Sequence, residues 1–264
     1  MDSLARFKEA ARVSWSTFAP FEMITGTTAP DLVRFADVRP GVRVLDVGCG
    51  TGVVALTCAR RGARVTGADL TPTLLERARE NAEIAGFDIT FEEADVEALP
   101  FADGAFDIVL SQFGHMFGPR PDVTLDEMLR VLTPGGTIAF STWPPELYTG
   151  RMFLLIGKYA PPPPPGVSSP ALWGDPAVVR ERLGDRVREL HFDRACMRFP
   201  ILSPAHMRLF TERNAGPVAA LVEKLADEPE RLAAFRAEFE ELVQTYFVDN
   251  TVRQDFLMSR AIRI

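Results

Sequence analysis

Five short apolar segments alternate with helical segments between residues 42 and 143, and this alternation most constrains the fold. The five segments are VRVLDVG (42–48), ARVTGADL (63–70), DITFEEAD (88–95), FDIVLSQF (106–113) and TIAFSTW (137–143). Helical spacing of apolar residues follows three of them, over 53–61, 71–85 and 123–132. Strands that alternate with helices form right-handed βαβ crossovers. The sequence therefore predicts an α/β fold with a doubly wound parallel sheet.

The flanking segments are mainly helical. We expect one helix over residues 2–13 and a second that starts near Thr28, has Pro30 in its first turn and ends near residue 37. After residue 143, the predicted order is a helix (151–159), a proline-rich connector (161–166), a helix capped by Asp175, a strand (187–199), a helical stretch (203–247) and a last strand (256–264).

Composition disfavours several classes of function. A chain of 264 residues with net charge −7 is a poor partner for phosphate backbones, so nucleic-acid binding is disfavoured. The three cysteines form no CxxC pair, and neither a disulfide framework nor a metal site is expected. No apolar run reaches the ~18 residues of a membrane span, and the N-terminus lacks a signal-peptide core, so we expect a cytoplasmic protein.

The glycine loop VLDVGCGTG (44–52) follows the first strand directly and opens a helix. Such a loop lets the backbone approach an anionic or nucleotide ligand. The dinucleotide fingerprint G-x-G-x-x-G requires a third glycine where this chain has Val53. The loop therefore suits a nucleoside with a small polar group better than a pyrophosphate.

Acidic residues end the second and third strands. Asp69 lies about 19 residues after Gly50, where a carboxylate can accept both ribose hydroxyls, although a helix cap is the alternative. Asp95 can bind an adenine amino group, with Val96 or Leu99 against the base, or it is a solvated loop residue. Together with Asp46 in the first strand, these residues mark the edge where open α/β sheets bind ligands.

These motifs resemble class I S-adenosylmethionine-dependent methyltransferases, in particular the small-molecule enzymes that include quinone-biosynthesis methyltransferases. The matching segments are VLDVGCGTG, VTGADLTPTLLERARE, EEADVEALPFADGAFDIVLSQF and EMLRVLTPGGTIAFSTW, all between Val42 and Trp143. The resemblance implies a Rossmann-like sheet of seven strands in the order 3-2-1-4-5-7-6, with strand 7 antiparallel. It also implies one domain over 1–264, with a cofactor core at 41–143, an N-terminal helical lid at 1–40 and a C-terminal part at 144–264 whose helical insertion (about 203–247) shares in the lid.

The resemblance also implies which residues bind S-adenosylmethionine. Asp46 and the backbone of Gly48, Cys49 and Gly50 are expected to bind the methionine amino and carboxylate groups. Asp69 is expected to bind the ribose. The adenine is expected to contact Leu70, Asp95 and Val96, and Ser111 and Gln112 are expected to lie near the methionine half. The family's reaction is in-line methyl transfer that leaves S-adenosylhomocysteine.

The methyl acceptor is less constrained. His115, just after the fourth strand, is a candidate base because an imidazole titrates near neutral pH, but it is also readily a structural loop residue. Aromatic side chains that can line an apolar acceptor pocket are Trp15, Phe18, Phe21, Phe113, Phe117, Trp143 and Trp173. A non-catalytic cofactor-binding module and a nicotinamide-dependent oxidoreductase remain alternatives. The apolar stripe of residues 230–246 packs on the core or forms a homodimer contact.

Overall fold

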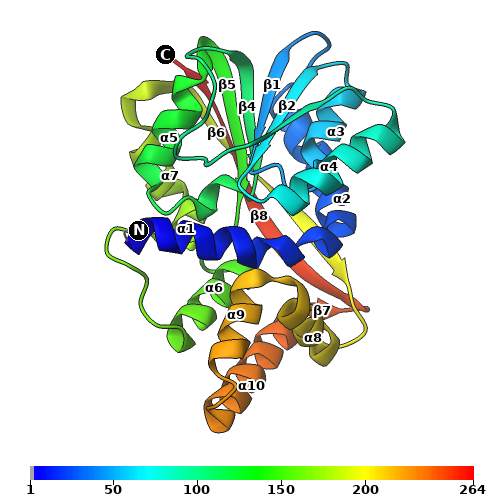
Figure 1. Cartoon of the computed structure of the whole chain (residues 1–264), viewed down its shortest axis with the longest axis vertical. Coiled ribbons are helices and arrows are strands. Elements are labelled where there is room, and N and C mark those ends of the chain that lie inside the picture. Colours follow the sequence, from blue (N-terminus) through cyan, green and yellow to red (C-terminus); the bar gives the residue numbers. More distant parts are fainter. Residues whose placement is uncertain (1–2) are drawn as a thin grey trace.

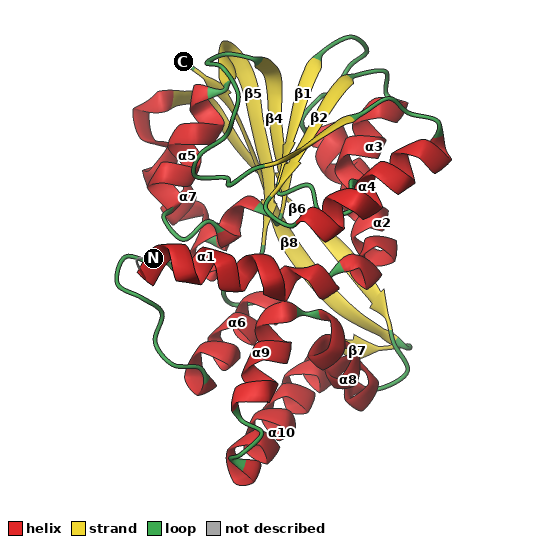
Figure 2. Ribbon diagram, in the orientation of Figure 1, coloured by secondary structure: helices red, strands yellow, loops and turns green. Residues whose placement is uncertain are grey.

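The computed structural model describes residues 3–264, which form a mixed sheet between two layers of helices (Figure 1, Figure 2). The sheet order is β3-β2-β1-β4-β5-β8-β6, and β8 runs antiparallel to both neighbours. Its strands are β1 (Arg43–Val47), β2 (Arg64–Asp69), β3 (Thr90–Glu93), β4 (Phe106–Gln112), β5 (Leu132–Thr142), β6 (Val187–Pro200) and β8 (Thr251–Arg263). The predicted order is confirmed with β8 as the seventh strand. The short β7 (Phe247–Val248), which pairs with β8, is an addition.

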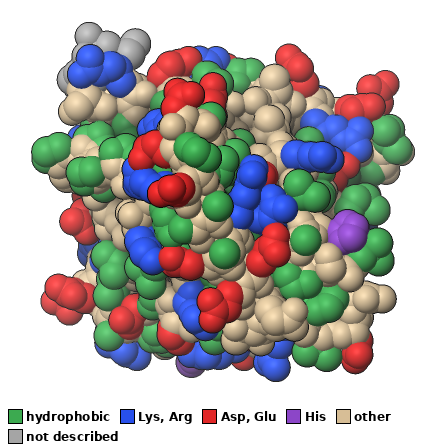
Figure 3. All heavy atoms as spheres, turned by 90° about the horizontal axis from the view of Figure 1, so that it is seen from below, with side chains coloured by type: hydrophobic (Ala, Val, Ile, Leu, Met, Phe, Trp, Pro, Cys, Tyr) green, Lys and Arg blue, Asp and Glu red, His purple; other side chains and the backbone are tan. Residues whose placement is uncertain are grey.

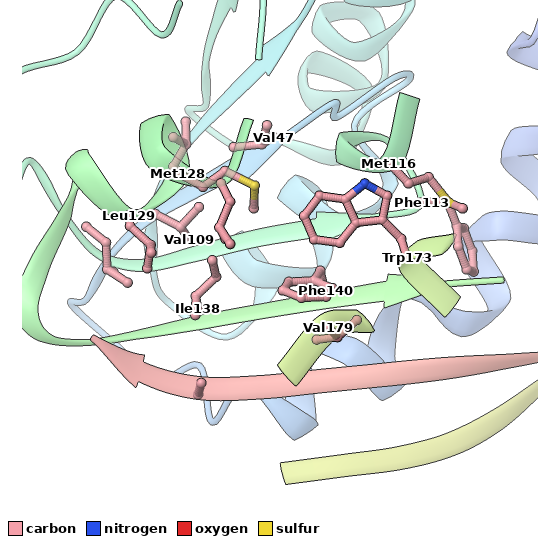
Figure 4. Packing of buried hydrophobic residues seen from close by; sticks show 14 of the residues in the cluster. Val47, Val109, Phe113, Met116, Met128, Leu129, Ile138, Phe140, Trp173 and Val179 are labelled. Atoms are coloured by element: carbon pink, nitrogen blue, oxygen red, sulfur yellow. The ribbon is translucent and has the colours of Figure 1, made fainter. Parts of the chain in front are cut away.

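Helices cover both faces of the sheet. On one face lie α2 (Glu22–Phe35), α3 (Val53–Arg60) and α4 (Pro72–Ala85), and on the other lie α5 (Pro121–Arg130) and α7 (Pro176–Leu183). Figure 4 shows the second face, where Met128 and Val179 lie in the same cluster as Ile138 of β5. Because the central strands are buried on both faces, they are nearly continuous apolar runs.

The helix predicted to start near Thr28 is wrong at its start, because α2 begins at Glu22 and contains Pro30 in its interior. A proline inside a helix lacks an N–H for the helical hydrogen bond and normally ends or kinks the helix. Here Leu32 and Val33 are completely buried against the sheet. Tertiary burial offsets the local cost, which a local sequence pattern does not report.

The helical insertion stands beyond the carboxyl ends of the parallel strands. It consists of α8 (Pro204–Asn214), α9 (Gly216–Lys224) and α10 (Pro229–Tyr246), which form an apolar core with α6 (Tyr148–Tyr159). Thr142 at the end of β5 pairs with Leu257, so the first residues of β8 extend past the sheet core toward these helices. Figure 1 shows the resulting helical layer below the sheet.

The N-terminal helix α1 (Ser3–Ser14) lies across the molecule between the sheet and the insertion (Figure 1). Its predicted first residue, Asp2, lies outside the described residues. The helix contacts α9, and the backbones approach so closely that a Cβ on Gly216 would lie 2.0 Å from the carbonyl oxygen of Ser14. The chain therefore crosses the edge of the sheet where α/β folds bind ligands.

The molecular surface carries interspersed charges. Figure 3 shows acidic and basic side chains side by side on the face seen from below. Across residues 3–264, no helix is both long and apolar enough to cross a membrane.

Candidate active site

A pocket opens at the carboxyl ends of the first four strands, beneath α1. Its open volume is about 1150 Å³, including space that is continuous with solvent, which suits a small-molecule ligand. Nine of the predicted cofactor residues line it: Asp46, Gly48, Cys49, Gly50, Asp69, Leu70, Asp95, Val96 and Gln112. Residues distant in sequence are thus brought to one cavity. The pocket lining also includes α1 and the turns that follow it, but no residue of the helical insertion, which instead backs α1.

The glycine loop uses two of its glycines for different purposes. Gly48 has φ +64°, and a Cβ there would lie 2.7 Å from Cα of Gly114, so its missing side chain lets two backbone segments touch. Gly50 has φ +53°, and a Cβ there would meet no atom within 4 Å. Only Gly50 therefore leaves open space for a ligand to approach the backbone.

Asp46 is a buried acid in the lining of the pocket. Its side chain is buried at the end of β1, where Oδ2 accepts a hydrogen bond from the Ala55 N–H at 3.0 Å. Within residues 3–264, Oδ1 has no hydrogen-bond partner. Burial, with a smaller contribution from the nearby Asp69 carboxylate, raises the pKa of Asp46 to about 8 against the opposing effect of the Ala55 N–H. Such an oxygen is placed to accept from a cationic ligand group.

Asp69 braces the glycine loop. Its carboxylate accepts the Gly50 N–H and the Thr71 N–H, each at 2.8 Å. Burial raises the pKa of Asp69, and the two N–H donors oppose that shift. The predicted alternative role as a helix cap is not observed, because the Thr71 N–H precedes α4 and this helix has no side-chain cap hydrogen bond, whereas Asp69 does line the pocket.

Asp95 is held from both sides. Its Oδ1 accepts the Glu97 N–H at 2.9 Å, and its Oδ2 accepts from Nζ of Lys8 at 2.5 Å. Lys8 belongs to α1, so the acid at the tip of the third strand contacts the helix that covers the pocket.

Ser111 and Gln112 end β4 but point in different directions. Ser111 is fully buried outside the pocket lining, where Oγ donates to the Val47 carbonyl at 2.6 Å and accepts the His115 N–H at 2.9 Å. Gln112 lines the pocket and donates from Nε2 to the Thr25 carbonyl at 2.8 Å. Among the described residues, its buried Oε1 has no partner. Gln112 can therefore contact a ligand directly, whereas Ser111 fixes the loop.

His115 lies in the core and not in the pocket lining. Its ring is 0% exposed and packs on Phe140 and Trp173, at centroid distances of 4.6 and 4.7 Å. Figure 4 shows Phe140 and Trp173 close together in this cluster. Burial, with a smaller contribution from the Arg182 charge, lowers the pKa of His115 to about 3. This placement argues against the predicted role as a base, because the ring neither faces the pocket nor accepts protons near neutral pH.

The predicted aromatic pocket is only partly observed. Trp15, Phe18, Phe113 and Phe117 line the cavity together with Phe7, which the sequence did not single out. The other three predicted residues, Phe21, Trp143 and Trp173, lie outside the lining. Trp143 stacks behind Phe113 with a centroid distance of 4.0 Å, so it supports the wall without forming it.

Three further residues were missed by sequence reasoning. Lys8 and Glu97 form an ion pair at the pocket edge, and Gly114 supplies the close contact with Gly48. The glycine in SQFGHMFG was visible in the sequence, but nothing local indicated which backbone it approaches. The partners of Lys8 lie about 90 residues away along the chain, so no periodicity pairs them.

The amino-acid sequence is similar to those of known methyltransferases, in agreement with the geometry of the pocket. The model of a methyltransferase domain family matches residues 44–136. The uncharacterized protein Rv1403c of Mycobacterium tuberculosis is 36% identical over 241 residues, which cover 91% of this chain and 88% of that protein. A demethylmenaquinone methyltransferase of Thermus thermophilus is 46% identical over 105 residues, 39% of this chain and 48% of the relative. The chain belongs to the class I S-adenosylmethionine-dependent methyltransferases. It is therefore an enzyme.

Solved structures share the methyltransferase fold. A putative methyltransferase from Bacillus halodurans superposes with a TM-score of 0.59 at 21% identity, covering 89% of this chain and 98% of that one. A putative sarcosine dimethylglycine methyltransferase from Galdieria sulphuraria gives 0.54 at 18% identity, covering 89% and 84%. At these identities the likeness concerns the fold and not the substrate.

Proposed function

We propose that this methyltransferase moves a methyl group from S-adenosylmethionine to a small-molecule acceptor by in-line displacement, releasing S-adenosylhomocysteine. The observation that carries the proposal is the unpartnered Oδ1 of Asp46, buried in the pocket beside the open backbone at Gly50. A buried carboxylate oxygen without a partner fits the cationic amino group of the methionine moiety. S-adenosylmethionine supplies a methyl group that its sulfonium charge already activates.

We assign different parts of the cofactor to different residues of the pocket. We assign the methionine amino and carboxylate groups to Asp46 and to the backbone of residues 48–50, with Gln112 alongside through its unpartnered Oε1. The ribose is assigned to Asp69, and the adenine to Leu70, Asp95 and Val96. Ser111 does not contact the cofactor in this proposal. Its hydroxyl instead positions the loop after β4, because it bonds to the Val47 carbonyl and to the His115 N–H.

The acceptor end of the pocket is apolar. The aromatic lining residues, which we assign to the acceptor, come mostly from α1, the turns after it and the loop after β4. Such a wall aligns an apolar acceptor and excludes water, and alignment alone accounts for much of the rate of a bimolecular displacement. Of the predicted lid over residues 1–40, α2 packs on the sheet. We propose that α1 and the turns after it form the lid of this chamber. We also propose that His115 does not deprotonate the acceptor, since its ring does not line the chamber. The acidic net charge of −7 favours a small molecule over a nucleic acid as acceptor.

Calorimetry with S-adenosylhomocysteine and NAD tests the cofactor assignment. We expect the wild-type protein to bind S-adenosylhomocysteine and not NAD. Asp69→Ala should weaken that binding about tenfold or more, since it removes a carboxylate that accepts charge-assisted hydrogen bonds, each of ~1.5–3 kcal/mol. Asp88→Ala is the matched control, because Asp88 is exposed and does not line the pocket. Binding of NAD without S-adenosylhomocysteine would refute the proposal.

A further inference from the structure

Helix α1 presents two neighbouring stripes of side chains to the rest of the protein. Phe7 and Ala11, followed by Trp15 just after the helix, are spaced four residues apart and line the pocket. The adjacent residues Lys8 and Arg12 have the same spacing and form ion pairs with acids at the tip of β3. One stripe therefore covers the chamber while the other ties the helix to the sheet.

The ion pairs of Lys8 and Arg12 differ in how far they are exposed to water. Nζ of Lys8 lies 2.5 Å from Asp95 Oδ2 and 2.6 Å from Glu97 Oε2, with the three side chains 19%, 26% and 0% exposed. Arg12 lies 2.7 Å from one oxygen of Glu93, with side chains 36% and 48% exposed. Ion pairs shielded from water contribute more than exposed pairs, which are screened. Lys8 therefore forms the ion pairs that are better shielded from water.

The far end of α1 is packed and not merely paired. Ser14 lies so close to Gly216 of α9 that no Cβ fits between them. Between this contact and the tip of β3, α1 has no fully buried residue. The helix is thus fixed at its C-terminal end and held by charge along its middle.

We propose that Lys8 is a positioning residue: it holds α1 closed over the pocket by its ion pairs with Asp95 and Glu97, and release of these pairs opens the route by which the nucleoside cofactor enters and leaves. The inference rests on the proposed function, because Asp95 is also assigned to the adenine. One carboxylate then belongs both to the closure and to the cofactor site. Opening pivots on the Ser14–Gly216 contact.

Stopped-flow binding of S-adenosylhomocysteine, followed by the fluorescence of Trp15, tests the proposal. Trp15 lines the pocket, whereas Trp143 and Trp173 are buried in the core, so the binding signal reports on the lid. Lys8→Met should raise the association and dissociation rate constants together, each about tenfold, with the dissociation constant changing less than about threefold. Arg12→Met is the matched control on the same helix and should change both rates less than about threefold. Added salt should accelerate exchange in the wild type more than in Lys8→Met.

Each alternative outcome has a distinct meaning. Unchanged rate constants in Lys8→Met would refute the proposal that Lys8 holds α1 closed. An increase in the dissociation rate constant alone would also refute it, because that result indicates a direct contact between Lys8 and the cofactor. A lower dissociation constant with an unchanged dissociation rate constant would also refute the proposal, because Lys8 would then compete with the adenine for Asp95. If the wild type binds no S-adenosylhomocysteine, the proposed function fails, and acrylamide quenching of Trp15 in the free protein still decides the latch. Greater quenching in Lys8→Met than in Arg12→Met supports closure by Lys8, and equal quenching refutes it.

Discussion

Replacing Asp46 by asparagine should strengthen the fold and weaken the cofactor site at once. The folded protein keeps a proton on Asp46 up to a pKa of about 8, whereas an aspartate exposed to water has a pKa of 3.8. A group whose pKa is raised by folding contributes stability that is lost as pH rises from the unfolded to the folded pKa. At pH 7 that window spans about three pH units, which at ~1.4 kcal/mol per unit sets an upper bound of about 4 kcal/mol.

The expected net gain is smaller than this bound. Asparagine keeps an oxygen for the Ala55 N–H, but its amide N–H groups face the same apolar surroundings, and an unsatisfied buried polar group costs about 1–3 kcal/mol. We therefore expect Asp46→Asn to raise the free energy of unfolding at pH 7 by about 1–3 kcal/mol. The proposed bond to the cofactor's amino group loses its charge, which should weaken S-adenosylhomocysteine binding about tenfold to a hundredfold.

Urea unfolding at several pH values and calorimetry measure the two effects. The stability advantage of Asp46→Asn over the wild type should grow by about 1.4 kcal/mol per pH unit between about pH 5 and pH 8 and then level off. Asp107→Asn is a control of opposite sign, because Arg43 lowers the pKa of Asp107 and that contribution is lost as pH falls. A variant that is less stable than the wild type at pH 7 and binds S-adenosylhomocysteine equally well would refute the reasoning about Asp46.

The remaining predictions concern His115 and the glycine loop. Because folding lowers the pKa of His115 to about 3, the wild type should lose about 1.4 kcal/mol per unit as pH falls from about 6.5 toward 3, and His115→Leu should show a shallower loss in urea unfolding at pH 7 and 5. Parallel losses would contradict the assignment. Gly48→Ala should destabilise by about 2 kcal/mol or more, since its Cβ would lie 2.7 Å from Gly114 Cα at a positive φ. Gly50→Ala should cost only about 1 kcal/mol of stability yet weaken S-adenosylhomocysteine binding, because its Cβ enters open pocket space; equal effects of both substitutions on stability and binding would remove the distinction.

Local pattern predicted the parts of the site that depend on strand ends. Asp46, Asp69 and Asp95 each lie at or just after the carboxyl end of a parallel strand, and parallel strands bring these ends to one edge whatever the loops do. The same argument did not place Ser111 and His115, which are both buried outside the pocket lining. Ser111 lies within β4 and faces away from the side that Gln112 presents to the pocket, and His115 lies in the turn after β4 with its ring in the core.

The order of the strands within the sheet followed from the resemblance to known methyltransferases, whereas the sequence by itself determined the alternation of strands and helices, the glycine loop and the acids near the strand tips. These features rest on short-range physics: apolar periodicity, the backbone freedom of glycine and the handedness of βαβ crossovers. Only the tertiary structure decided that α2 continues through Pro30, that the insertion backs α1 without entering the pocket, and that Lys8 meets acids about 90 residues away. Such contacts depend on which distant surfaces exclude water from one another, and that information does not lie within any one stretch of chain.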